Sequence, residues 1–200
     1  YIDSALAFID RKGDKPFFVN LCPNDVHDPH LPDSRVLEEF VSLTNNPWEQ
    51  KFFAVLRNLD NQIGRLINSL DKRGLLDNTI IVFTSDRGDT MGNHGLLLKG
   101  FMHYRGTLQA PLMVRAPGIE AQENHELASS IDIGPKLLEL CELPFYEGVQ
   151  EETLVPILLG DKKSVRDSVL IEDDIAPVTS RLTPIPAKTR TLIAKTHLYA

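Results

Sequence analysis

The stretch from Asp86 to Arg115 concentrates side chains that bind ions. Four basic side chains against two acidic ones give it a charge of +2, in a chain whose formal net charge is −7. Its charged residues and histidines are Asp86, Arg87, Asp89, His94, Lys99, His103, Arg105 and Arg115. Glycines at 88, 92, 95, 100 and 106 allow a ligand to approach the backbone closely. Carboxylate oxygens beside cationic and imidazole groups suit a metal ion that holds an oxygen-rich anion such as sulfate or phosphate. We predict such a site here; the alternative is a surface loop with scattered charges.

A second polar segment, residues 23–32, contains three prolines and carries His27 and His30. It follows a short apolar run, and loops that leave the end of a buried strand are where α/β proteins commonly place ligand-binding groups. Both histidines are therefore candidate ligands. The alternative is that they are ordinary loop residues.

The apolar runs that precede these two loops are predicted strands. Residues 17–22 are apolar and bounded by proline on both sides, and residues 79–84 are β-branched and apolar, as in a strand covered on both faces. We expect the two loops to meet at one rim of a sheet.

A helix over residues 47–73 is the longest predicted element. Asn46 can cap it, Pro47 suits its first position, and Glu49 completes a pattern similar to a capping box. Apolar residues recur along it every three or four positions, and Gly74 suits its C-terminal end.

The remaining elements give an alternating pattern. We predict helices over 1–9, 34–41 and 132–141, strands over 111–115, 168–172 and 191–195, and a proline-rich loop over 175–186. This alternation predicts one α/β piece, residues 1–200, with a mostly parallel sheet flanked by helices.

Composition excludes several functions. The acidic balance argues against a general nucleic-acid binder and gives no support for binding to an anionic membrane. Cys22 and Cys141 are too few for a disulfide framework or a cysteine-based zinc site. No apolar run approaches the roughly 20 residues of a membrane span. Nucleophile-elbow, Walker and dinucleotide motifs are absent, and no signal indicates the compartment or the oligomeric state.

The two ends suggest a piece of a longer protein. Tyr1 is followed directly by the pattern of a helix interior, and the last predicted strand lies close to Ala200. We expect truncation on the N-terminal side and also on the C-terminal side. The alternative is a processed or trimmed terminus.

Four blocks of the sequence resemble the sulfatases of the alkaline-phosphatase-like superfamily. Residues 17–29 resemble the strand followed by His-x-Pro, and residues 77–88 resemble the metal segment written DNT…TSD(N/H)G. Residues 94–112 resemble the continuation HG…K…YEG…VPL, and residues 130–138 resemble the helix written DLAPTLL. The blocks follow the order of the family along nearly the whole chain.

This resemblance implies an alkaline-phosphatase-like sandwich and assigns roles to four residues. Asp86 would coordinate a divalent cation, usually calcium, or manganese in some phosphonate or phosphodiester relatives. His27 would donate a hydrogen bond to the bound sulfate, and Lys99 would hold a sulfate oxygen or the leaving-group oxygen. His94 is a further substrate-binding candidate. Sulfate ester hydrolysis needs charge stabilisation at the sulfuryl oxygens and a proton for the departing alkoxide.

Two features depart from the family pattern. Arg87 occupies the position of a usual second metal ligand, Asn or His, but a guanidinium has no lone pair to offer. Either the metal loses a ligand, or Arg87 points outward, or its guanidinium binds the substrate anion. The nucleophile motif Cys-x-Pro-x-Arg, whose cysteine becomes formylglycine, is matched by neither Cys22 nor Cys141. We expect it, together with a pair of metal-binding aspartates, outside this chain.

The resemblance therefore implies part of a hydrolase that cleaves sulfate esters of a small molecule or a saccharide, and this part alone should be inactive. One alternative is a phosphonate monoester or phosphodiester hydrolase of the same superfamily. Another is a non-catalytic relative that serves as a binding or scaffolding domain, in which Arg87 marks a lost metal site.

Overall fold

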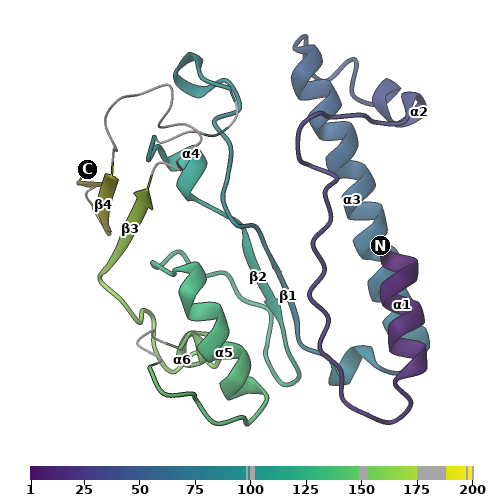
Figure 1. Ribbon diagram of the computed structural model, residues 1–200, viewed down its shortest axis with the longest axis vertical. Coiled ribbons are helices and arrows are strands. Elements are labelled where there is room, and N and C mark those ends of the chain that lie inside the picture. The colour runs from purple at the N-terminus through teal and green to yellow at the C-terminus, as the bar shows by residue number, and fades with distance from the viewer. Residues whose placement is uncertain (98, 100–101, 149–152, 175–187, 197, 200) are drawn as a thin grey trace. The chain divides into compact units, whose positions relative to one another are not determined.

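Helices and short strands alternate along the chain, which confirms the mixed α/β class (Figure 1). The computed structural model describes residues 1–97, 99, 102–148, 153–174, 188–196 and 198–199. The chain divides into two compact units, Tyr1–Thr79 and Ile80–Ala200. That residues 1–200 act as one piece stays a prediction.

The first unit is built on one long helix. Helices α1 (Ile2–Arg11) and α2 (Ser34–Glu38) both pack against α3 (Pro47–Lys72), which leads into a 3-10 turn, Leu76–Asn78. The apolar side chains buried on α1 and α3 are Ile2, Ala5, Ile9, Ala54, Val55, Leu59 and Leu70. Removing this apolar surface from water holds the helices together.

The ends of α3 confirm the features predicted from sequence. Asn46 Oδ1 accepts a hydrogen bond from the Trp48 amide at 3.0 Å, and Asn46 Nδ2 donates to Glu49 Oε1 at 3.2 Å. Gly74 has a φ of +65°, the left-handed conformation that glycine adopts at helix ends.

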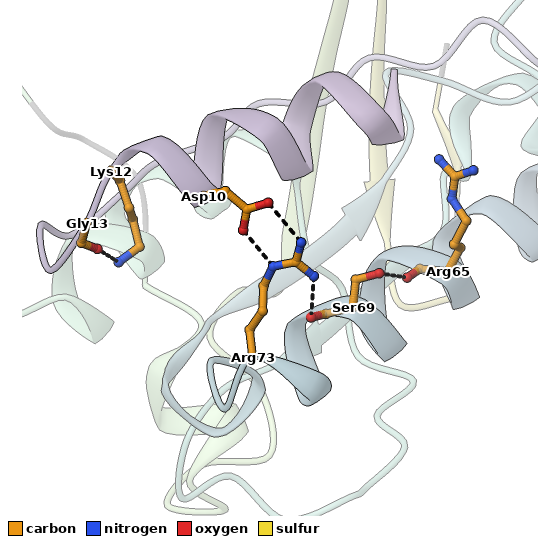
Figure 2. Close-up of polar contacts among 6 residues, drawn as sticks. All are labelled: Asp10, Lys12, Gly13, Arg65, Ser69 and Arg73. Atoms are coloured by element: carbon orange, nitrogen blue, oxygen red, sulfur yellow. Dashed lines mark hydrogen bonds and ion pairs between the residues drawn. The ribbon is translucent and has the colours of Figure 1, made fainter.

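Two ion pairs join α1 to α3. Arg73 donates to both carboxylate oxygens of Asp10, at 2.7 and 2.9 Å, and also to the Ser69 carbonyl oxygen (Figure 2). Arg65 pairs with Asp3 at 2.6 Å. The hydrogen bonds from Arg73 lower the pKa of Asp10. Because these groups are largely exposed, the pairs orient α1 more than they stabilise the fold.

The described residues of the second unit form two sheets. Strands β1 (Ile81–Thr84) and β2 (Leu112–Arg115) pair antiparallel, with Val82 opposite Val114. Strands β3 (Ser168–Asp174), β4 (Lys188–Ala194) and β5 (Leu198–Tyr199) form an antiparallel sheet in that order. Three helices accompany the sheets: α4 (Arg105–Leu108), α5 (Ile133–Leu140) and α6 (Val155–Leu158).

The expectation of a mostly parallel sheet is wrong for the strands that the structure describes, because all their pairings are antiparallel. After β1 the chain turns back through a loop and the short α4, so β2 returns beside β1 in the opposite direction. Residues 17–22 were also expected to form a strand, but they form none here, and Phe18 is 77% exposed.

The other predicted helices and strands are confirmed with shifts of a few residues at their ends. The predicted loop over 175–186 lies outside the described residues. Among the described residues, no helix is both long and apolar enough to cross a membrane.

A charged cluster lies buried at the start of α5. Asp132 pairs with Arg166 and accepts a hydrogen bond from the Ser129 amide at 2.8 Å. Lys136, one turn further along, is fully buried, and its ammonium has no hydrogen-bond partner among the described residues. Burial lowers the pKa of Lys136 from 10.5 to about 8, although the charge of Asp132 opposes this shift.

Replacing this ammonium should stabilise the protein. A drop in the pKa of Lys136 from 10.5 to about 8 lowers the free energy of unfolding by about 3 kcal/mol. This loss is complete below pH 8, where Lys136 is protonated in both the folded and the unfolded state. Above pH 8 the unfolded chain binds more protons than the folded one, so the loss shrinks as the pH rises toward 10.5. We expect Lys136→Met to raise the melting temperature at pH 7, and its advantage to decline between pH 8 and 10. Calorimetry of this variant beside the exposed control Lys51→Met would measure both effects. A melting temperature that Lys136→Met leaves unchanged, or raises equally at every pH, would contradict the lowered pKa of Lys136.

Candidate active site

The acidic and basic residues after β1 contact each other. Arg87 Nε lies 3.8 Å from Asp86 Oδ2, and Arg87 Nη1 donates to the Gly88 carbonyl oxygen at 3.3 Å. The Ser85 hydroxyl donates to the Arg87 carbonyl oxygen at 2.7 Å and lies 3.4 Å from Asp86 Oδ1. The side chain of Asp86 is 82% exposed and that of Arg87 36%. The Asp86 carboxylate is thus open to a ligand, but the positively charged guanidinium of Arg87 already lies beside it.

Backbone contacts hold this loop against α4. The Gly88 amide donates to the Thr107 carbonyl oxygen at 2.8 Å, and a Cβ atom at position 88 would collide with the Gly106 carbonyl oxygen. A Cβ atom at Gly106 would lie 3.0 Å from the Asp89 carbonyl oxygen. Glycine at both positions lets the two backbones approach this closely.

A tight turn then presents His94. Thr90 Oγ1 and the Gly92 amide both donate to the Leu96 carbonyl oxygen, at 2.9 and 2.8 Å. Within this turn Gly92 and His94 have φ values of +88° and +57°. The turn therefore fixes the position of the His94 side chain relative to α4.

The ring of His94 stacks on that of Tyr104, with centroids 4.2 Å apart and planes at 21°. Both rings line a cavity of roughly 370 Å³ together with Thr90, Asn93, Arg105 and Gln109. Arg105 Nε donates to Gln109 Oε1 at 2.7 Å, which orients the guanidinium along the cavity wall. The cavity offers an aromatic surface and a cation to a polar ligand.

The other predicted site residues lie in both units. Lys99 is exposed and lies between the His94 turn and α4 along the chain. His27 belongs to the first unit, where its Nδ1 donates to the Asp28 carbonyl oxygen at 2.7 Å. Asp86, Arg87, His94 and Lys99 thus share the second unit, and His27 does not.

Asp86 offers an exposed carboxylate to a cation. Among the described residues, no group of three or more His, Cys, Asp or Glu side chains could hold a metal ion. Asp86 fits as one oxygen ligand, because it is exposed and acidic. Arg87 does not fit, because it offers donors only.

Two histidines have contacts that sequence reasoning did not identify. His103, noted above only as part of the polar stretch, has Nδ1 2.6 Å from Thr191 Oγ1 and Nε2 4.0 Å from Asp173. It therefore contacts both β3 and β4. His30 is buried against α3. The partners of His103 and the helix against which His30 packs are distant in the chain, so no local pattern could reveal them.

Comparison with known proteins decides the family. The family model described as Sulfatase matches residues 1–143. The chain belongs to the sulfatase family. That segment contains Asp86, Arg87, His94 and Lys99 as well as His27.

Similar proteins support this assignment. N-acetylglucosamine-6-O-sulfatase of Bacteroides thetaiotaomicron is 34% identical over 129 residues, which covers 64% of this sulfatase chain and 23% of that protein. A solved structure from the same organism, described with the metabolism of multiple glycosaminoglycans, has a TM-score of 0.82 at 21% identity. It covers 97% of this chain and 46% of that one, and it shows that the fold is alkaline-phosphatase-like. Phosphonate monoester hydrolase of Agrobacterium radiobacter has a TM-score of 0.66 at 28% identity and covers 76% of this chain and 32% of that one.

This sulfatase chain spans between 11% and 31% of the length of the first curated relatives it matches.

The contact between Gly88 and Gly106 gives a direct test of how the Asp86 loop is held. Gly88→Ala places a methyl group against the Gly106 carbonyl oxygen, so the loop must shift and the bond from the Gly88 amide is lost. We expect a loss of about 1–3 kcal/mol and faster amide exchange in residues 86–92. Gly64→Ala in α3 is the control: its Cβ atom meets open space, and alanine should stabilise that helix by about 1 kcal/mol. Unchanged stability and exchange in Gly88→Ala would contradict the geometry.

Proposed function

We propose that the full-length protein hydrolyses a sulfate ester, with a sulfated saccharide as the substrate class. The observation that carries this proposal is the sulfatase family match over residues 1–143, which includes every site residue named above. The saccharide substrate is supported by the relative whose name specifies N-acetylglucosamine 6-O-sulfate chemistry. It is also supported by a structural neighbour described in complex with D-glucosamine-2-N,6-O-disulfate. Formylglycine, supplied from outside this chain, is the proposed nucleophile, and the 200 residues alone are proposed to be inactive.

Lys99 and His27 are proposed to contact the sulfate. An ammonium group placed at the sulfuryl or leaving-group oxygen stabilises the charge that develops there. In His27, Nδ1 donates to a carbonyl oxygen and therefore carries a proton. Donation from the other ring nitrogen to a sulfate oxygen then requires the doubly protonated ring, which adds a positive charge next to the anion. His94 contributes the aromatic cavity wall that it forms with Tyr104.

Asp86 is the proposed ligand from this chain for a divalent cation. Sulfatases generally use such a cation and formylglycine, and calcium is the proposed ion, with manganese the alternative. A bound cation stabilises negative charge on the sulfuryl oxygens. Asp86 suits this role because its carboxylate is exposed at the end of β1, while Ser85 and the Gly88 contact hold the backbone on either side.

Arg87 is proposed to contact the substrate anion. Its guanidinium lies 3.8 Å from the Asp86 carboxylate, which supports a place for Arg87 beside the proposed cation ligand. A group with five donors and a permanent charge binds sulfate well and repels a metal ion.

Phosphonate monoester hydrolysis is the second candidate function. The observation in its favour is the similarity to the phosphonate monoester hydrolase of Agrobacterium radiobacter. A non-catalytic binding or scaffolding role is the remaining alternative, and the experiment below would detect it as a lack of turnover.

Activity measurements on the full-length protein test the proposed reaction. We expect turnover of an aryl sulfate with a higher kcat/KM than for the matching aryl phosphonate. Lys99→Ala should reduce kcat/KM by about 100-fold or more, because it removes a charge at the reacting oxygens. His125→Ala is the control, since His125 is exposed and has no proposed role. Preference for the phosphonate would favour the second candidate, and the absence of turnover with both esters would contradict an enzyme.

Cation binding tests the proposed position of Arg87. Removing a positive charge this close to an exposed carboxylate should raise the calcium affinity of the full-length protein about tenfold. Titration calorimetry of Arg87→Asn and Arg87→His would measure this increase, and the exposed Arg57→Asn controls for the change in net charge. Equal or weaker calcium binding in both Arg87 variants would show that Arg87 does not compete with the cation.

A further inference from the structure

The loop that carries His27 is attached to α3 by a buried histidine. His30 has only 4% of its side chain exposed. Its ring meets those of Trp48 and Phe52 edge to face, with centroids 5.1 and 5.5 Å apart, and these two rings stack on each other. Because Trp48 and Phe52 are one helical turn apart on α3, they form a rigid slot for the imidazole.

Inside this slot, the nitrogens of His30 face the backbone around His27. His30 Nε2 donates to the Val26 carbonyl oxygen at 3.3 Å, and since a carbonyl only accepts, Nε2 carries the proton. The other nitrogen, Nδ1, is buried without a hydrogen bond and lies 3.7 Å from Asp28 Oδ1. His30 therefore contacts residues on both sides of His27.

The orientation of the His27 ring depends on the backbone of the same short segment, residues 24–28. Its Nδ1 donates to the Asp28 carbonyl oxygen at 2.7 Å, and its amide donates to the Asn24 carbonyl oxygen at 3.2 Å. A second attachment to α3 comes from Asn58, whose side chain donates to Asp25 Oδ1. If the backbone at residues 26–28 turned, the Asp28 carbonyl would leave the His27 ring.

We propose that His30 is a positioning residue for His27: it holds the backbone of residues 26–28 so that the Asp28 carbonyl keeps the proton of His27 on Nδ1. The importance of this for turnover rests on the proposed role of His27 at the sulfate. The effect on the His27 ring follows from the hydrogen bonds of His30 to Val26 and of His27 to Asp28.

The direct test is the tautomer of His27, measured by ¹⁵N NMR of the imidazole nitrogens at pH 8 in the full-length protein. We expect the wild type to hold the proton mainly on Nδ1. His30→Phe keeps a ring in the aromatic slot but loses the bond to Val26, so the Nδ1–H fraction should fall at least threefold. His30→Gln can place an amide donor near the position of Nε2 and should restore most of the wild-type fraction. His125→Phe, which changes an exposed histidine in the same way, should have no effect.

The outcomes separate positioning from stability. A lower melting temperature alone, with unchanged ¹⁵N shifts of His27 in both His30→Phe and His30→Ala, would overturn the proposal, as would a failure of His30→Gln to restore them. In the full-length protein, His30→Phe should lower kcat/KM for an aryl sulfate about tenfold, because the His27 ring loses the Asp28 carbonyl that fixes its orientation, and His30→Gln should recover it. A shifted tautomer in a protein without sulfatase activity would uphold the positioning role and refute the proposed function instead.

Discussion

The candidate site in the second unit depends on the close approach of two backbones, at Gly88 and Gly106. Because neither residue has a side chain, the Gly88 amide reaches the Thr107 carbonyl oxygen and joins the loop after β1 to α4. Asp86 and Arg87 lie just before this contact, and the turn that presents His94 lies just after it. One short stretch of backbone therefore joins this loop to α4, while the side chains of Arg87 and Asp89 form hydrogen bonds within the loop.

The loop of the first unit is held differently, through side chains. His30 and Asn58 attach it to α3, whose caps and apolar stripe are supplied by its own sequence. Backbone contacts tolerate almost no change in residue size, whereas a slot formed by aromatic rings accepts another ring of similar shape. In the second unit, a larger residue at Gly88 or Gly106 should therefore displace the proposed sulfate-binding residues. In the first unit, replacing His30 by another aromatic residue should preserve the packing of its ring against α3.

A structural feature could be predicted from the sequence when the residues that determine it lie close together along the chain. Helix α3 was predictable because Asn46, Glu49 and Gly74 lie next to the ends they define. Asp86, Arg87, His94 and Lys99 could be selected because they follow a recognisable strand. The pairing of β1 with β2, the burial of His30 against Trp48 and Phe52, and the buried ammonium of Lys136 depend on partners set by the tertiary fold. For residues 17–22, the apolar composition indicated a strand, but composition cannot show whether another strand pairs with it.

The pair formed by Asp86 and Arg87 links cation and anion binding in the proposed reaction. While the guanidinium lies beside the carboxylate, each lowers the field that the other presents to solvent. Asp86 would hold a divalent cation, which would supply positive charge for the sulfate oxygens. Arg87, which cannot ligate that cation, would keep its donors for the sulfate. Arg87 would then weaken the binding of the cation alone and strengthen the binding of cation and sulfate together. A permanent charge at a usual ligand position is consequently compatible with catalysis, provided that substrate and cation bind as a pair.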